Sequence, residues 1–363
     1  MHVVMIIDSE RLVHEKDMLR DIAQGFIAKE IEVSWVVPED LETEDFQYID
    51  TDLQLANQIE IPMAVGPWLR KARVSRLSNA FSGSMPDVIY LVGKETWRVG
   101  FDLAQALDIQ VAIDVWSMDL IKSLPQGRSA TNVGAYIACT NELAKAIKRR
   151  RIDRALVNTV AFGVDIPDKA RNVLEDPSES IAIAIMGSGK DIAAYKALLS
   201  GLARVTREFS QLHICLELRG PHEHDIWRYA QRLELLGFIS AIRDASHHAE
   251  AVVGCDVLVI PERYGDIRSL MLKAMGYCVP IVASQDRALD MLVADENAII
   301  IDSPSTEQWS KHLTRLLSHP DLARQLGQAG RKSVAESFGA KRQIEGLLET
   351  FQKVLSGDAY SFA

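Results

Sequence analysis

Length, composition and charge narrow the class of protein before any motif is considered. The chain has 363 residues, a formal net charge of −10, 48% hydrophobic residues and 25% charged residues. This length exceeds one ordinary α/β domain and suits two. An acidic chain lacks the positive charge typical of nucleic-acid-binding proteins, so we expect no nucleic-acid partner. No run of about 18 apolar residues occurs, so no membrane span is predicted.

The cysteines do not have the spacing of a metal site or a disulfide framework. They are Cys139, Cys215, Cys255 and Cys278. We interpret them as buried thiols in a reducing cytoplasm, and we expect no metal and no organic cofactor. The first apolar run begins near His2 with no basic and apolar leader before it, which agrees with a cytoplasmic location.

In the first half, short β-branched apolar runs predict the buried strands of a parallel sheet. These runs are Val3–Ile7, Val33–Val37, Val88–Val92, Val111–Val115, Tyr136–Cys139 and Leu156–Val160. Helical periodicity lies between them at Leu12–Lys29, Trp97–Leu107 and Asn141–Arg151. The alternation predicts βαβ units with right-handed crossovers. Residues 1–165 are therefore expected to form an N-terminal Rossmann-like domain.

A charged stretch with prolines, residues 166–180, predicts a linker. A second strand–helix alternation follows and predicts another Rossmann-like domain over residues 181–338. Its expected strands are Ile181–Met186, Leu212–Leu218, Phe238–Ile242, Asp256–Ile260, Ile281–Ala283 and Ile299–Ile301. Ser305 and Gln308 have the spacing of a capping box for a helix beginning at Thr306.

Residues 339–363 are predicted to be a C-terminal helix and tail. One face of the helix, which begins at about Ala340, is apolar. The residues of that face are Ile344, Leu347, Leu348, Phe351 and Leu355. Since the second domain has no strand left to extend, this helix is expected to pack elsewhere.

The clearest candidate site is the glycine-containing loop after the first strand of the second half. Open parallel sheets bind ligands at the carboxyl ends of their strands. Gly187, Ser188, Gly189 and Lys190 lie there, directly before a helix. Glycines let the backbone approach an anion, and a helix start supplies free N–H groups. The loop does not complete a P-loop or a dinucleotide fingerprint, so a plain tight turn with a surface lysine is the alternative.

Two further strand ends add candidate residues. One strand ends at Gly220. The loop after the strand ending at Ile260 contains Glu262, Arg263 and Arg268, and Ser269 is predicted to be the N-cap of a helix over Leu270–Tyr277. A phosphate could bind at that helix start beside the arginine.

These strand ends, in this order, resemble the retaining glycosyltransferases of the GT-B fold, family 4. The matching stretches are "HICLELRG", "AEAVVGCDVLVIPE" and "LMLKAMGYCVPIVAS" in the second half and "MPDVIYLV", "DIQVAIDVW" and "VAFGVDIP" in the first. The resemblance implies two Rossmann-like domains facing a cleft, with a C-terminal helix crossing back to the N-terminal domain. It also implies a nucleotide-sugar donor in the second domain and an acceptor of unknown class (glycan, lipid or protein) in the first.

The resemblance assigns the donor's nucleotide and phosphates to the strand-end loops. The predicted donor- and phosphate-binding residues are Gly187, Ser188, Gly189, Lys190, Gly220, Glu262, Arg263, Arg268, Ser269, Leu270 and Lys273. Backbone N–H groups around a leaving phosphate would stabilise the charge that develops in the transition state.

Several family positions are changed in this chain. The family's two donor-site glutamates fall on Gly265 and Lys273, and its first-domain histidine falls on Trp116. Glu262 lies three residues before Gly265, the position of the family's first glutamate. The geometry of the loop decides whether the Glu262 side chain reaches the place of that glutamate. No catalytic residue can be named from the sequence.

Three functions stay open at this point. The first, which we favour, is a hexosyltransferase-type enzyme with rearranged donor contacts. The second is a catalytically inactive GT-B relative that binds a partner protein or a glycan. The third is another GT-B enzyme class, such as an epimerase or a phosphorylase.

Two basic clusters interrupt the acidic chain, at Trp68–Arg76 and Lys145–Arg154. A basic cluster beside a tryptophan can rest on an anionic membrane, so peripheral contact at the inner membrane face through Trp68–Arg76 is one interpretation. The alternative is an ordinary solvated surface.

Overall fold

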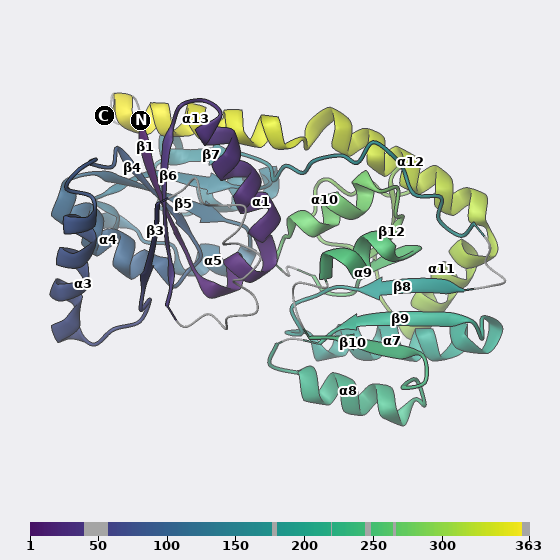
Figure 1. Cartoon of the computed structure of the whole chain (residues 1–363). Helices are drawn as coiled ribbons and strands as arrows, with labels where there is room; N and C mark the ends of the chain where they lie inside the picture. Colours follow the sequence, from purple (N-terminus) through teal and green to yellow (C-terminus); the bar gives the residue numbers. More distant parts are fainter. Residues whose placement is uncertain (40–56, 176–179, 219, 244–247, 264–265, 358–363) are drawn as a thin grey trace. The chain divides into compact units, whose positions relative to one another are not determined.

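The computed structural model describes residues 1–39, 57–175, 180–218, 220–243, 248–263 and 266–357. The chain divides into two compact units (Figure 1). The first contains residues 1–163 together with 340–363, and the second contains residues 164–339. In the stretch expected to be a linker, Arg171 belongs to the second unit and donates to the carbonyl of Val253 at 3.1 Å.

The first unit is built on a seven-stranded parallel sheet with the order β3-β2-β1-β4-β5-β6-β7. Its strands are β1 (His2–Ile7), β2 (Glu32–Pro38), β3 (Asn57–Ile61), β4 (Val88–Val92), β5 (Gln110–Val115), β6 (Val133–Ala138) and β7 (Val157–Thr159). Strands β1 and β4 are buried along their whole length, as continuous apolar runs in a sheet covered on both faces require.

Helices connect and cover these strands (Figure 1). They are α1 (Ser9–Ile27), α3 (Pro67–Ala80), α4 (Thr96–Leu107), α5 (Met118–Ser123), α6 (Asn141–Lys148) and α13 (Ala340–Ser356). The last of these, α13, packs on the first unit, where the ring of Phe351 lies 6.0 Å from that of Phe26. The expectation that the C-terminal helix returns to the first unit is confirmed.

The second unit is built on a six-stranded parallel sheet with the order β10-β9-β8-β11-β12-β13. The strands are β8 (Ile181–Ile185), β9 (Leu212–Glu217), β10 (Ile239–Ile242), β11 (Val257–Ile260), β12 (Ile281–Ser284) and β13 (Ala298–Ile301). The helices are α7 (Ile192–Glu208), α8 (Glu223–Arg232), α9 (His248–Gly254), α10 (Ser269–Gly276), α11 (Thr306–Ser318) and α12 (Pro320–Ser337).

The strand order of the second unit reverses between β8 and β11. From β8 the chain moves outward to β9 and β10, and it then returns to add β11 on the other side. The loops that leave the carboxyl ends of β8 and β11 therefore diverge and leave a crevice, which is where open α/β sheets bind ligands. The described residues of these two loops are 186–191 after β8 and 261–263 and 266–268 after β11.

The structure corrects several sequence-based expectations. Strand β3 was not predicted, and α1 begins three residues before Leu12 because Asp8 caps it. In α13, Leu355 is 46% exposed and Val354 is buried in its place.

Within the described ranges, no helix combines the length and apolarity that a membrane crossing requires.

Candidate functional site

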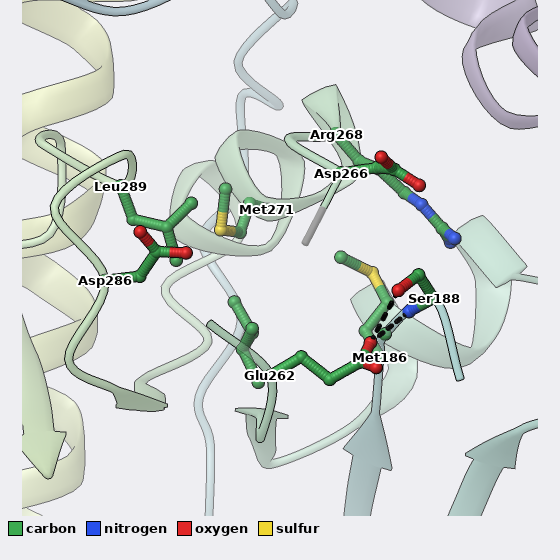
Figure 2. A pocket seen from close by; sticks show the side chains of 10 residues that line it. Met186, Ser188, Glu262, Asp266, Arg268, Met271, Asp286 and Leu289 are labelled. Atoms are coloured by element: carbon green, nitrogen blue, oxygen red, sulfur yellow. Dashed lines mark hydrogen bonds between the residues drawn. The ribbon is translucent and has the colours of Figure 1, made fainter. Parts of the chain in front are cut away.

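The loop after β8 encloses a carboxylate that belongs to the protein itself. Glu262 lies just beyond β11, is 3% exposed, and directs its side chain at the loop (Figure 2). Its Oε2 accepts hydrogen bonds from the backbone N–H of Ser188, from the Ser188 hydroxyl at 3.0 Å and from the Gly189 N–H at 3.2 Å. Its Oε1 accepts from the N–H groups of Lys190 and Asp191, both at 2.7 Å. The loop thus has the donors of an anion site, and an internal anion occupies it.

Two glycines explain how the backbone can surround this carboxylate. A Cβ atom on Gly187 would lie 2.6 Å from the Glu262 Oε2 and 2.5 Å from the Tyr195 hydroxyl. Gly220 has φ +108°, and a Cβ there would lie 2.1 Å from the Ser188 carbonyl oxygen. Both positions therefore need glycine. The predicted residue Gly220 supports the loop from outside, and the next helix continues this support because the His222 N–H donates to the Gly189 carbonyl at 3.3 Å.

A second carboxylate, that of Glu217 at the end of β9, lies beside the first. Its Oε2 accepts from the Gly187 N–H at 3.3 Å, and its Oε1 accepts from Arg268 Nη1 at 2.6 Å. The Nδ1 of His248 lies 3.5 Å from the same Oε1. Arg268 is only 4% exposed. The arginine predicted to bind phosphate is thus paired with a buried glutamate.

The electrostatic effect of these carboxylates reaches the helix that follows the loop. Tyr195 of α7 is fully buried, and burial together with the charges of Glu262 and Glu217 raises its pKa well above the usual value. Its hydroxyl is therefore neutral at physiological pH.

Two of the other predicted cations, Lys190 and Arg263, also have partners inside the unit. Lys190 Nζ lies 3.1 Å from Asp266 Oδ2, and Arg263 donates to the carbonyl of Asp302. Lys273 is half-buried on α10. Helix α10 begins at Ser269 with Arg268 as its N-cap residue, so the prediction that Ser269 is the N-cap is wrong by one position. Ser269 and Leu270 form the buried first positions of this helix, and Gly265 lies outside the described residues.

A small hollow lies between the two loops. It is lined by Met186, Gly187, Ser188, Ile260, Glu262, Asp266, Arg268, Met271, Asp286 and Leu289 (Figure 2). Its free volume is ≈ 30 Å³, enough for about two water molecules. Because the Glu262 carboxylate accepts hydrogen bonds from the loop N–H groups, a diphosphate cannot take the same hydrogen bonds without a movement of this residue.

Sequence reasoning missed two residues of the site. Asp191 caps α7, where its Oδ1 accepts from the N–H groups of Ala193 and Ala194 at 3.0 Å. The sequence does predict a helix cap at this position, because aspartate is a favoured N-cap residue and Asp191 directly precedes the helical run. The role of Glu217 could not be predicted from the sequence. A glutamate at the end of an apolar strand does not indicate that it pairs with Arg268, which lies 51 residues further along the chain.

The first unit has a comparable reversal of strand order between β1 and β4, and charged side chains fill it. Arg11 is buried beside Glu15 at 3.3 Å and Asp114 at 3.6 Å, and its guanidinium lies 4.2 Å from the ring centre of Trp116. Burial raises the pKa of Asp8 and of Asp114 to about 6. Trp116 stands where the family has a histidine, and here its ring packs against a buried cation.

The basic cluster Trp68–Arg76 is partly used for internal contacts. Arg70 pairs with Asp102, and Arg73 is buried, donating to the carbonyl of Met63 at 2.6 Å. Trp68 is 84% exposed and Leu69 is 54% exposed. Two basic side chains of this cluster, Arg70 and Arg73, are therefore engaged in contacts within the fold.

Comparison with known proteins identifies a family match in the second unit. Residues 169–333 match the family described as "Glycosyl transferases group 1". Together with the two parallel sheets and the returning helix, this match confirms the resemblance to GT-B glycosyltransferases of the family 4 type.

Curated proteins that resemble the chain share low identity with it. The putative glycosyltransferase EpsD of Bacillus subtilis (strain 168) is 23% identical over 164 residues, which is 45% of this chain and 43% of that protein. D-inositol 3-phosphate glycosyltransferase of Rhodococcus opacus (strain B4) is 24% identical over 232 residues, covering 59% of this chain and 51% of that protein. The chain thus spans about half the length of these relatives.

Solved structures match the chain along nearly its whole length. Anabaena HepE in complex with UDP-glucose has a TM-score of 0.75 at 13% identity, covering 97% of this chain and 99% of that chain. Sucrose-phosphate synthase of Thermosynechococcus elongatus also has a TM-score of 0.75, at 14% identity, covering 98% and 99%. At such identities the likeness shows the GT-B fold and nothing finer.

Proposed function

We propose that this chain transfers a sugar from a nucleotide-sugar donor to an acceptor, with the donor diphosphate on the loop of residues 187–191. One observation carries the proposal. Five hydrogen-bond donors from Ser188, Gly189, Lys190 and Asp191 converge on one anion-sized position at the start of α7. The group 1 family match and a structural neighbour solved with UDP-glucose support a nucleotide sugar as the source of the anion.

The chemistry of sugar transfer fits such a loop. When the bond between the sugar and the diphosphate breaks, negative charge develops on the leaving phosphate oxygen. Fixed N–H groups and the positive end of a helix dipole stabilise that charge without reorganising during the reaction. The donor sugar and the acceptor class are not fixed by these residues, and no side chain of the loop is assigned as a catalytic base.

The test is release of nucleoside diphosphate from a panel of UDP-, GDP- and ADP-sugars, with glycan, lipid and peptide acceptors. We expect acceptor-stimulated release with at least one donor. Gly220→Ala should lower that rate by tenfold or more, because a Cβ at this positive-φ position would collide with the Ser188 carbonyl. Gly237→Ala is the matched control, since a Cβ there meets no atom within 4 Å. Absence of release with every pair would contradict the proposal.

A non-catalytic binding subunit is the second candidate, although no comparison supports it. The observation that favours it is that Glu262 and Glu217 already occupy the loop amides and Arg268. It predicts that the purified chain transfers no sugar alone but binds a partner protein or a glycan. Sugar transfer by the chain alone would remove it.

Peripheral membrane contact through Trp68–Arg76 stays a separate proposal. The exposed side chains of Trp68 and Leu69 support this membrane contact. The ion pair of Arg70 with Asp102 weakens the proposal, because this positive charge is already neutralised within the protein. Binding to vesicles that contain anionic lipid, compared between the wild type and Trp68→Ala, tests it.

A further inference from the structure

We infer that Glu262 is a resident competitor of the donor phosphate, and that nucleoside diphosphate binds only when this carboxylate leaves the loop. The inference rests on the proposed function and goes beyond it by naming the residue that sets donor affinity. At this position the side chain acts neither as a sugar ligand nor as a replacement for a lost family glutamate, since both of its oxygens are directed into the loop.

Glu262 occupies the hydrogen-bond positions that a phosphate would need. Each Glu262 oxygen takes hydrogen bonds that a phosphate oxygen would need: Oε2 from Ser188 and Gly189, and Oε1 from Lys190 and Asp191. A carboxylate and a phosphate both bind such donors at 2.7–2.9 Å in charge-assisted contacts. The same N–H groups cannot serve two anions in one place, so the two must compete.

The charges around the hollow also oppose a second anion while Glu262 is in place. Of the residues that line the hollow, three are carboxylates (Glu262, Asp266 and Asp286) and one, Arg268, is a cation. Arg268 is itself paired with Glu217, and Lys190 is paired with Asp266. A diphosphate that approached with Glu262 in place would meet a surplus of negative charge at close range. Departure of Glu262 removes one of these charges and frees the N–H groups in the same movement.

A competing carboxylate and a purely structural carboxylate at position 262 have different consequences. Glu262 also joins the β8 and β11 loops, and loss of such a tie lowers stability whether or not a ligand competes for it. Competition makes a further prediction that a tie does not make. Removing the carboxylate should raise the affinity for free anions at the loop, and the bound anion should then restore the lost stability.

The experiment is calorimetric titration of the full chain with UDP, GDP, ADP and inorganic pyrophosphate. We compare the wild type with Glu262→Gln and with the control Glu307→Gln. Glu307 is an exposed carboxylate of α11 paired with Arg204, so this control removes one charge from the same unit away from the loop. We expect Glu262→Gln to bind pyrophosphate and at least one nucleoside diphosphate tenfold or more tighter than the wild type does. The control should stay within about twofold.

Hydrogen exchange of the amides of residues 188–191 gives a second readout. In the wild type these amides should be protected without ligand, because Glu262 holds them. In Glu262→Gln they should exchange faster and become protected when pyrophosphate is added. Should Glu262→Gln not fold, Glu262→Asp serves the same purpose, because its shorter carboxylate cannot reach both sides of the loop and should also bind pyrophosphate more tightly than the wild type.

The outcomes separate the inference from the proposed function. A variant affinity equal to or below that of the wild type for every probe overturns the inference, even if sugar transfer is found. Tighter pyrophosphate binding by the variant, with no nucleotide binding by either protein, supports the resident anion and contradicts the nucleotide-sugar donor. Tighter binding of both probe types supports the two together.

Discussion

At the residue scale, the site is a set of buried charges that satisfy one another. Glu262 holds the backbone of one loop, and Glu217 holds Arg268 and the Gly187 N–H. Buried ion pairs are costly to break from one side, because the remaining charge is left without a partner. The residues that would meet a ligand are therefore also residues on which local stability depends.

Glu217→Gln tests that dependence. The change removes the carboxylate with which the buried Arg268, 4% exposed, forms an ion pair. We expect the free energy of unfolding to fall by about 3 kcal/mol, measured by urea denaturation. Glu336→Gln, which breaks an exposed pair with Lys332, should leave the denaturation midpoint almost unchanged. Equal midpoints for Glu217→Gln and the wild type would show that the buried pair contributes no stability.

Asp8 at the first unit's switch point predicts a dependence of stability on pH. Burial raises its pKa from 3.8 to about 6, so the folded protein keeps a proton that the unfolded chain has lost. Its stabilising contribution is complete below pH 3.8 and is lost as the pH rises through about 6. Asp8→Asn keeps a good helix cap but cannot ionise. The free energy of unfolding of Asp8→Asn minus that of the wild type should therefore rise by on the order of 2 kcal/mol between pH 4 and pH 7. A stability difference that does not change with pH would contradict the raised pKa.

At the element scale, helix starts and strand ends position the site. Helix α7 begins where the loop ends, and Asp191 serves both: its side chain caps the helix while its N–H donates to Glu262. Most strands were predictable because their apolar, β-branched runs are buried on both faces. Strand β3 was not, because its sequence NQIEI is polar and it lies at the sheet edge with most of its residues partly exposed.

Asp191→Ala tests the capping role of this residue, because the variant keeps the backbone N–H that donates to Glu262. Loss of the two hydrogen bonds to Ala193 and Ala194 should lower the free energy of unfolding by about 1 kcal/mol. Asp191→Asn should keep most of it, since asparagine caps equally well. Thermal or urea unfolding of the three proteins distinguishes them, and a full loss in Asp191→Asn would mean that charge, rather than capping, carries the effect.

At the scale of the whole molecule, the sequence predicts more of the fold than of the site. The two sheets, the returning α13 and the loops at the strand ends follow from periodicity and from the family resemblance. The pairing of Glu262 with residues 188–191 does not, because it joins positions more than 70 residues apart whose side-chain directions only the folded sheet defines. The sequence identified the loops of the site but assigned Lys190 and Arg268 to a ligand, whereas the fold pairs them with Asp266 and Glu217.

The most direct measurement of the central claim is a crystal structure of the chain with a bound nucleoside diphosphate. The account predicts that the phosphate oxygens accept hydrogen bonds from the N–H groups of residues 188–191, with the Glu262 carboxylate moved out of the loop. A nucleotide bound elsewhere on the chain, with Glu262 still holding those N–H groups, would contradict it.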